Sequence, residues 1–495
     1  MAHLLSFGAA GVSLLLALPA AAQDVAPPVA MSFEAASQAL GKGSRALSAA
    51  DHEVRAAQAT ADALKALRRP VVSASASVVE YQKTLAIDLS GSKSDLTGAT
   101  TDFLAGLPGQ FPPGFQEIVS QVTQRVGAAL PGLVSAIPDT LRFQTRDTAF
   151  RPTVTAALPL YTGGAIPAIQ RGAQAGVAIA EATQAQGRDL SQLNLVRTYF
   201  GQQVAEQLAA STRATRDGFD RHLSDARKLE QQGVLSHARV LEVQVARDAA
   251  DRAYLRADLE AATARDTLAR LLDAEGGVQP TTALFVNAQP LPPKAEFLAA
   301  SDHPQARGAD AARAVAAAGV DLARSRYRPQ AFAFGEYNLN RNDALPTEPD
   351  WIAGVAVRMT LLSNVDRRRT LDAAHERERA AADSAVEIRK TIATQTIRAY
   401  DLTETARRTF LSLDSSVAAA EENLRVQELS FREGEATSAA VIDAQAAIAT
   451  VRTQRIAAAY EYDLALAGLL VASHQLDSFG GYLARADHRL GAVTP

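Results

Sequence analysis

The side chains that could carry out chemistry form none of the arrangements typical of an enzyme. The eight histidines show no His-Glu-x-x-His or other paired-ligand spacing, and the run from His375 to Glu378 fits a solvated helix face better than a site. Neither a G-x-x-x-x-G-K-[ST] phosphate loop nor a G-x-S-x-G nucleophile motif occurs. The absence of cysteine excludes disulfides, thiol catalysis and a lipid anchor on cysteine. We therefore expect no enzymatic activity, no metal and no cofactor.

Two acidic residues, by contrast, occupy matching places in the sequence. Glu242 lies nine residues after Gly233, and Asp443 lies nine residues after Gly434. Carboxylates that converge from several chains on one axis repel one another and attract cations. The basic run Arg367–Arg369 is interpreted first as solvated, and second as an interior patch that favours anions.

The two glycines belong to an internal duplication with an offset of 201 residues. Gly233 and Gly434 are 201 residues apart, and so are the two Val-[Leu/Ile]-[Glu/Asp]-x-Gln-x-Ala runs that begin at Val240 and Val441. Without a gap, the same offset aligns 196–199 with 397–400 and 154–160 with 355–361. The chain is thus expected to contain two copies of one architecture.

Each copy is expected to contain a pair of long helices joined at its glycine. Apolar residues recur at spacings of three and four over 166–230, 236–272, 367–431 and 437–470. The longer helices would reach about 100 Å at 1.5 Å per residue, which is typical of a coiled coil or a helical barrel. A shorter helix is expected over 33–68. The composition agrees, because 47% of residues are hydrophobic but only 5% aromatic, which favours closely packed helices. The net charge of −4 offers no basic surface for nucleic acid.

Four segments switch to a period of two and are predicted to be strands. They are 72–78, 154–160, 331–337 and 351–359, and each can be extended to about 9–11 residues, the length of a tilted membrane-crossing strand. Residues 1–22 are predicted to be a secretory signal, with a short anchor helix as the alternative. No later run is apolar and long enough for a membrane helix. Strands in lipid must close into a barrel, and the smallest bacterial barrels have about eight. Four strands per chain would therefore require oligomerisation, and a trimer would supply twelve.

Three further segments interrupt the repeat pattern. The first predicted strand hairpin carries an insertion, 84–146, which we interpret as an extracellular lid, with a disordered loop as the alternative. Its predicted amphipathic helix carries Phe115, Ile118, Val119, Val122 and Val126 on one face. The expected organisation is a signal (1–22), a first repeat (23–272), a linker forming a small mixed collar (273–293), a second repeat (294–473) and a polar tail without predicted structure (474–495).

The order of these elements, occurring twice, resembles the TolC-type outer-membrane efflux proteins over nearly the whole chain after the signal. The resemblance implies a mainly α fold with a membrane β-barrel: long helical hairpins forming a trimeric periplasmic helical barrel, plus a twelve-stranded β-barrel with four strands per chain. It further implies an exit duct of a tripartite efflux or type I secretion system in outer-membrane lipid. Its partners would be two identical chains, a periplasmic adaptor and an inner-membrane pump.

The resemblance also assigns roles to residues. Asp443 falls where the family commonly places an acidic ring at the periplasmic gate, and Glu242 is its counterpart. Arg239 and Ala440 stand where a second acid is common, which puts a two-layer gate in doubt, and both acids could be solvated helix charges. The expected adaptor-docking tips are Gly233, Val234, Leu235 and Ser236, together with Gly434, Glu435, Ala436 and Thr437. Arg358 and Arg367 are expected to line the pore.

One other class of protein fits part of the pattern. A soluble periplasmic coiled-coil adaptor or structural protein would also contain long helical hairpins. Adaptors, however, carry one hairpin between compact β domains, whereas this chain is predicted to contain two hairpins and little else. The exported substrate, whether a drug, a metal or a polypeptide, is not specified by any motif.

Overall fold

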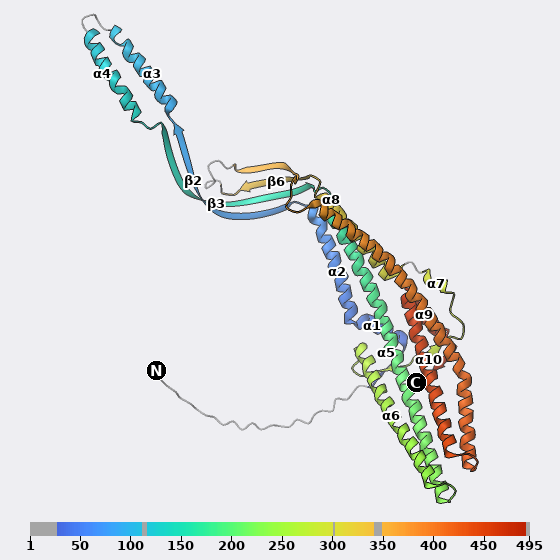
Figure 1. Cartoon of the computed structure of the whole chain (residues 1–495). Helices are drawn as coiled ribbons and strands as arrows, with labels where there is room; N and C mark the ends of the chain where they lie inside the picture. The colour runs from blue at the N-terminus through green and yellow to red at the C-terminus, as the bar shows by residue number, and fades with distance from the viewer. Residues whose placement is uncertain (1–26, 111–115, 300–301, 341–348, 492–495) are drawn as a thin grey trace, which may run out of the picture. The chain divides into compact units, whose positions relative to one another are not determined.

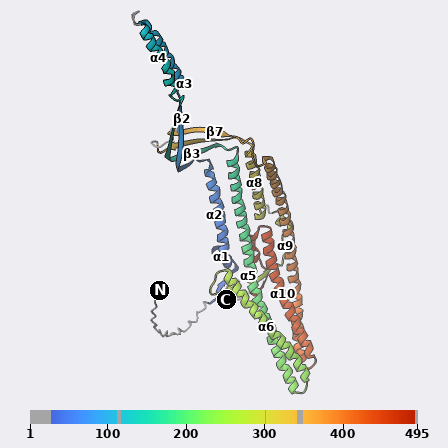
Figure 2. The ribbon, with the colours of Figure 1, turned by 60° about the vertical axis from the view of Figure 1, so that its left-hand side comes forward.

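The long helices begin and end close to the predicted positions. The computed structural model describes residues 27–110, 116–299, 302–340 and 349–491, so the predicted signal lies outside the described residues. The four long helices are α5 (Ala165–Gln231), α6 (His237–Leu271), α9 (Arg367–Arg432) and α10 (Ser438–Ala472). In both Figure 1 and Figure 2, α5 lies beside α6 and α9 lies beside α10. The prediction of two long helical hairpins is confirmed.

The chain divides into a helical unit and a strand unit, and each repeat contributes to both. The helical unit takes in Met1–Lys65, Pro167–Ala323 and Val365–Pro495, and the strand unit takes in Ala66–Ile166 and Arg324–Asn364. The shorter helices are α1 (Phe33–Gly43), α2 (Arg45–Lys65), α7 (Lys294–Leu298), α8 (Pro304–Ser325) and α11 (Phe479–Ala484). The helix predicted over 33–68 is interrupted at Ser44, whose backbone is extended, and it ends in a 3-10 turn at Ala66–Arg68.

An aromatic core joins the long helices to the linker and to the C-terminal segment. Phe33 stacks on Phe200 with ring centroids 5.4 Å apart, and Phe285 of the linker meets Phe479 at 5.6 Å. Residues 476–490 form a 3-10 turn (Leu476–Ser478), α11 and strand β8 (His488–Leu490). Phe479 is buried in this core, so the segment for which the sequence predicted no particular structure contributes to the fold at these residues.

Short strands and polar side chains hold the linker against the helices. Strand β4 (Val278–Pro280) pairs in parallel with β1 (Val29–Met31), and β5 (Leu284–Val286) pairs antiparallel with β8. Gln203 of α5 donates its amide to the carbonyl of Pro280 at 2.8 Å, and Glu404 of α9 accepts from the amide of Leu291 at 2.8 Å. Gln203 and Glu404 are related by the 201-residue offset. Equivalent positions of the two repeats therefore both bind the linker backbone, one as a hydrogen-bond donor and the other as an acceptor.

The strand unit contains one antiparallel sheet in the order β2-β3-β6-β7. Its strands are β2 (Val71–Asp88), β3 (Thr140–Tyr161), β6 (Gln330–Asn338) and β7 (Trp351–Arg358). The four predicted strands are all present. However, β2 and β3 have 18 and 22 residues, longer than expected, because both continue into the predicted insertion and pair as far as Asp88 and Thr140.

The rest of the described insertion is a helical hairpin. Helix α3 (Ser90–Gly106) was not predicted, and α4 (Gln116–Ser135) covers the predicted amphipathic helix apart from Phe115, which lies outside the described residues. In the described part of the insertion, the alternative of a disordered loop is therefore wrong. The lid interpretation itself stays a prediction.

Candidate functional site: the helical tips and the sheet faces

The two tips have the same backbone structure, and glycine makes it possible. Gly233 and Gly434 adopt φ of +73° and +79°, the left-handed conformation that glycine adopts without steric cost. After Gly233, the amide of Val234 donates to the carbonyl of Leu229 at 2.9 Å, and that of Gly233 donates to Glu230 at 2.9 Å. This pair of bonds is a Schellman motif, which satisfies carbonyls at the helix end. The second tip repeats both bonds, from Glu435 to Ser430 at 2.8 Å and from Gly434 to Phe431 at 3.1 Å.

The predicted tip residues divide into a packed set and an exposed set. Leu235 and Ala436, which occupy equivalent positions, are half-buried against a cluster that includes Leu223, Val240 and Phe431. Val234 is 64% exposed, and Gly233, Ser236, Gly434, Glu435 and Thr437 are also exposed. Thr437 is the N-cap of α10, and its side chain accepts a hydrogen bond from the amide of Ala440 at 3.2 Å. The equivalent residue before α6, Ser236, forms no such side-chain cap. Each tip thus presents an exposed turn on a packed base.

Three residues that the sequence analysis missed join the two hairpins just above their tips. His222 of α5 lies 3.1 Å from the hydroxyl of Ser438 (Nε2 to Oγ), and its ring meets that of Phe431 edge to face at 4.6 Å. Burial lowers the pKa of His222, which favours the neutral ring. The only signal in the sequence was that a histidine and a serine fall near the tips.

The two predicted gate acids, Glu242 and Asp443, have different surroundings. Glu242 is exposed and forms an ion pair with Arg239, one helical turn earlier, at 2.8 Å. Asp443 is also exposed, and its carboxylate forms no hydrogen bond or ion pair within the ranges that the structure describes. Arg239 supplies a local counter-charge to Glu242, whereas the matching residue beside Asp443 is Ala440. Of the two acids, Asp443 is therefore the better candidate for a converging ring.

One face of the sheet is apolar. Pairing puts Val78 opposite Phe150, Val154 opposite Tyr337, and Tyr337 opposite Trp351, and side chains paired in this way share a face. The same face carries Val72, Ala74, Ala76, Ala156, Leu158, Ala333, Val355 and Val357. Val357 is 70% exposed and Val72 is 65% exposed, so this apolar face is open to the surroundings of the chain.

The opposite face carries hydroxyl groups on β2 and β3 and charges such as Arg358, but it also carries Phe332, Phe334 and Ile352 on β6 and β7. Ser73 and Thr155 share a hydrogen bond of 2.7 Å across β2 and β3, and Ser75 and Thr153 share one of 2.9 Å. Arg358 falls on this face, because it is one residue out of step with Val357, and its guanidinium lies 5.8 Å from the ring centre of Phe332. Arg367 begins α9 in the helical unit, whereas Arg358 belongs to the strand unit. The role of Arg358 in lining a pore stays a prediction.

The described residues contain neither a metal site nor a membrane-spanning helix. In the part of the chain that the structure covers, no three histidines, acids or cysteines gather as a metal site would require. Among the described helices, none combines the length and apolar character needed to cross a membrane.

Comparison with solved structures identifies the fold. The structure matches a membrane protein from Pseudomonas aeruginosa with a TM-score of 0.70 and 14% identity, over 89% of this chain and 93% of that one. It matches the outer membrane protein VceC of Vibrio cholerae with a TM-score of 0.68 and 13% identity, over 89% and 95%. It matches the open state of the MtrE outer membrane channel of Neisseria gonorrhoeae with a TM-score of 0.66 and 15% identity, over 90% and 89%. The chain has the fold of the TolC-type outer-membrane channels, as the sequence resemblance predicted.

Comparison of the sequence with known proteins gives a match to only part of the chain. No family model matches the chain. Protein CyaE of Bordetella pertussis is 30% identical over 250 residues, which cover 47% of this chain and 52% of that protein. The match therefore spans about half the length of this curated relative.

Proposed function

We propose that this chain is the outer-membrane exit duct of a tripartite efflux or secretion system. It would be a passive conduit that extends into the periplasm and opens when a periplasmic adaptor and an inner-membrane pump dock at its helical tips. The observation that carries the proposal is the two-faced sheet in a chain with the fold of outer-membrane channels. Its valine-rich face suits lipid, and the hydroxyl groups that β2 and β3 carry on the other face suit a water-filled interior.

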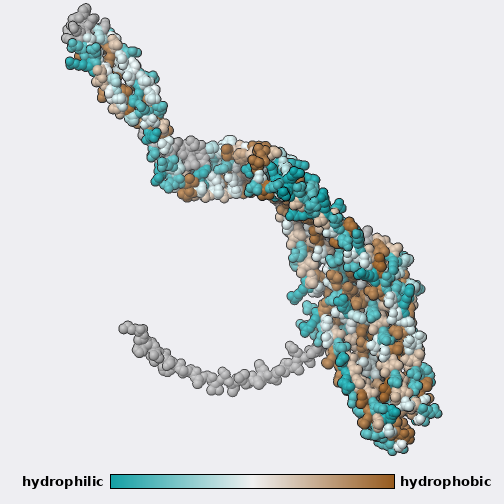
Figure 3. Space-filling model, in the orientation of Figure 1, coloured by the Kyte–Doolittle hydropathy of each residue, from teal (hydrophilic) through white to brown (hydrophobic). Residues whose placement is uncertain are grey.

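The exposed strand edges and helix faces support a homotrimer. Within the described residues, β2 pairs only with β3 and β7 only with β6, so the sheet ends in two open edges. Open edges are not tolerated in lipid, and joining β7 of one copy to β2 of the next in three copies closes twelve strands. On α6, Leu241, Val245, Leu255 and Leu259 are exposed, the last by 69%. Figure 3 shows hydrophobic residues among hydrophilic ones over the visible surface of the helical unit. Such a surface favours contact with further copies.

The alternative of a soluble periplasmic adaptor is not favoured. A soluble protein would have to leave the whole apolar face of the sheet in water, including Trp351, which is 63% exposed. Exposed apolar patches of this kind mark a membrane or protein contact in a stable protein. The comparison structures are channels, which agrees with the expectation that the chain is not an enzyme.

Single-channel recording tests the conduit and its gate together. We expect purified protein in planar bilayers to conduct ions and to be blocked by a multivalent cation, such as hexamminecobalt, added at the tip side. Asp443→Ala should weaken this block about tenfold, the effect of losing roughly 1.4 kcal/mol of attraction from three converging carboxylates. Glu242→Ala is the matched control and should change the block less, because Arg239 already neutralises that carboxylate.

The outcomes of the recording separate two claims. Protein that inserts but conducts neither alone nor after its adaptor is added contradicts the proposed function. Channels whose cation block is the same in the wild type and in Asp443→Ala leave the conduit standing but remove Asp443 from the gate.

A further inference from the structure

The α3–α4 hairpin of the insertion has a second apolar seam that no described part of the chain covers. Its internal seam is half-buried and follows heptad-like spacing, with Thr97, Thr100 and Leu104 of α3 facing the side of α4 that carries Thr123 and Leu130. Beside that seam, a separate set of large apolar side chains is exposed. We call it the apolar face of the hairpin; it consists of Leu96, Phe103, Val122, Val126 and Leu133, and Leu133 is 71% exposed.

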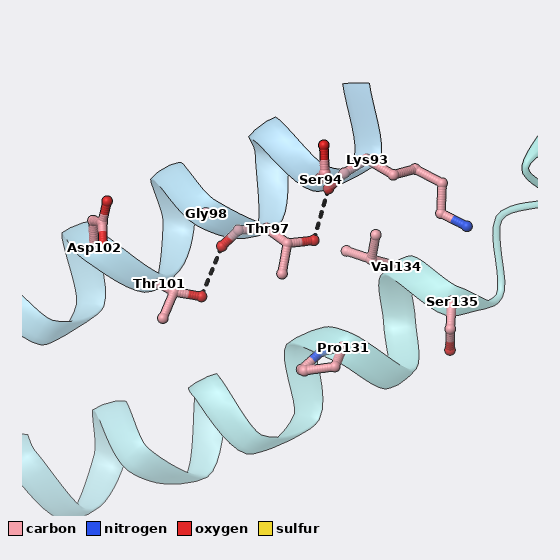
Figure 4. A pocket seen from close by; sticks show the side chains of 9 residues that line it. All are labelled: Lys93, Ser94, Thr97, Gly98, Thr101, Asp102, Pro131, Val134 and Ser135. Atoms are coloured by element: carbon pink, nitrogen blue, oxygen red, sulfur yellow. Dashed lines mark hydrogen bonds between the residues drawn. The ribbon is translucent and has the colours of Figure 1, made fainter. Parts of the chain in front are cut away.

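Helical geometry places these five side chains on one side of the hairpin. Leu96 and Phe103 are seven residues apart, as are Val126 and Leu133, so each pair lies on one line along its helix. The other side of the hairpin is a groove of mixed polar and apolar character. The groove has a volume of about 610 Å³, and its lining, shown in Figure 4, includes Ser94, Thr101, Asp102 and Ser135 together with Pro131 and Val134. Ser94 and Ser135 are each two residues from a member of the apolar face, about half a turn around the helix.

The base of the hairpin is fixed to the strands that carry it. The ammonium group of Lys93 binds the carboxylate of Asp139 at 2.7 Å and the carbonyl of Ile137 at 2.6 Å, and the Lys93 side chain is largely buried. The amide of Leu89 donates to the carbonyl of Asp139 at 2.8 Å. The hairpin is therefore anchored at its base as a continuation of β2 and β3.

The composition of the hairpin indicates what covers its apolar face. Residues 90–137 contain only five charged residues, Lys93, Asp95, Asp102, Glu117 and Arg125, which is sparse beside the 21% charged residues of the whole chain. A helix that lies on a membrane surface carries several cations on its polar face and aromatic anchors such as tryptophan. This segment has no tryptophan or tyrosine, and Lys93 is already paired. Its many glycine, alanine, serine and threonine residues instead permit close helix–helix contact.

We propose that the apolar faces of the α3–α4 hairpins pack against one another in the trimer and form a six-helix cap on the strand end of the duct. This inference rests on the proposed function, because the trimer brings the three hairpins together. Strand β2 forms an open edge of the sheet and leads directly into α3, so an assembly that closes this edge also gathers the hairpins. The occupant of each apolar face is a second copy of this chain.

Cysteine cross-linking tests the cap cleanly, because the chain contains no cysteine of its own. Leu133→Cys in full-length protein in outer membranes should give covalent dimers with a short bifunctional maleimide, at least about tenfold more than the control. The matched control is Gln124→Cys, which is exposed on the same helix but lies two residues from both Val122 and Val126, on the opposite side. Phe103→Cys gives an independent position on α3.

Different results would contradict the six-helix cap and the proposed function. Trimers by mass that cross-link no better through Leu133→Cys and Phe103→Cys than through Gln124→Cys overturn the cap and leave the duct intact. Protein that is monomeric in mild detergent contradicts both. A fluorophore on Leu133→Cys that is quenched by nitroxide-labelled lipid assigns the apolar face to the bilayer and overturns the cap.

Discussion

Replacing Gly434 by tryptophan is expected to abolish pump-dependent export while trimers still assemble. Gly434 lies at the exposed tip between α9 and α10, and no atom lies within 4 Å of the place where a Cβ would stand. A bulky side chain there would project outward from the turn rather than into the helices. If the adaptor meets this surface, the indole ring prevents that contact. The measurement is export by a strain that lacks its own duct, with trimer yield followed on semi-native gels.

Gly434→Ala separates docking from turn geometry. Both substitutions place a Cβ at φ of +79°, which costs about 1–2 kcal/mol in either case. A loss of export caused by the turn alone should therefore be similar in the two variants. We expect near-normal export from Gly434→Ala and none from Gly434→Trp. Normal export by the tryptophan variant would refute docking at this tip.

Replacing Glu404 by alanine is expected to destabilise the helical unit by about 3–5 kcal/mol, because it leaves a buried guanidinium without its partner. The side chains of Glu404 and Arg407 are only 11% and 7% exposed, and they bond at 2.8 Å (Nη2 to Oε2) and 3.1 Å (Nε to Oε1). Arg407 also donates to the carbonyl of Ala288, and Glu404 accepts from the amide of Leu291. The pair thereby fastens the linker to α9. Denaturant unfolding of the detergent-solubilised protein measures the loss.

The effect should depend on pH in a defined direction. Burial alone would raise the pKa of Glu404, but the hydrogen bonds from Arg407 and from the Leu291 amide hold it below the ordinary value. A carboxyl whose pKa is lower in the folded state stabilises the fold above its unfolded pKa of about 4.3 and loses that contribution as the pH falls through the folded value. The difference between wild type and Glu404→Ala should thus shrink below about pH 4. Glu404→Gln, which keeps an acceptor for Leu291, should lose less; an equal loss would contradict the role assigned to that bond.

The sequence predicted those parts of the fold that local rules determine. The helices α5 and α9 end within one or two residues of the predicted positions, because apolar periodicity and one glycine in a left-handed turn specify them. The strands followed from their period of two. Among the predicted site residues, the tips lie where the glycines place them.

The parts that were missed depend on tertiary contacts or weak local signals. Helix α3 begins Ser-Gly-Ser-Lys-Ser and is rich in glycine and threonine, so its packing on α4 rather than its propensity accounts for it. Phe479 lies in a short, mainly polar segment, and only the tertiary structure shows that its side chain is buried. Asp463 is fully buried, accepts from the amide of Phe285 at 3.3 Å, and has its pKa raised by burial, yet no sequence pattern separates it from the exposed acids. Gln203 and Glu404 are separated by the 201-residue offset of the duplication, and this offset was a sequence signal that the two positions have equivalent roles.

The central claim, that three copies close one conduit with their strands and helices, is tested most directly by electron microscopy of the purified protein in detergent. We predict particles with three-fold symmetry and a hollow tube that continues from a strand cylinder into a long helical barrel. Solid single-chain particles without a central channel would contradict the account.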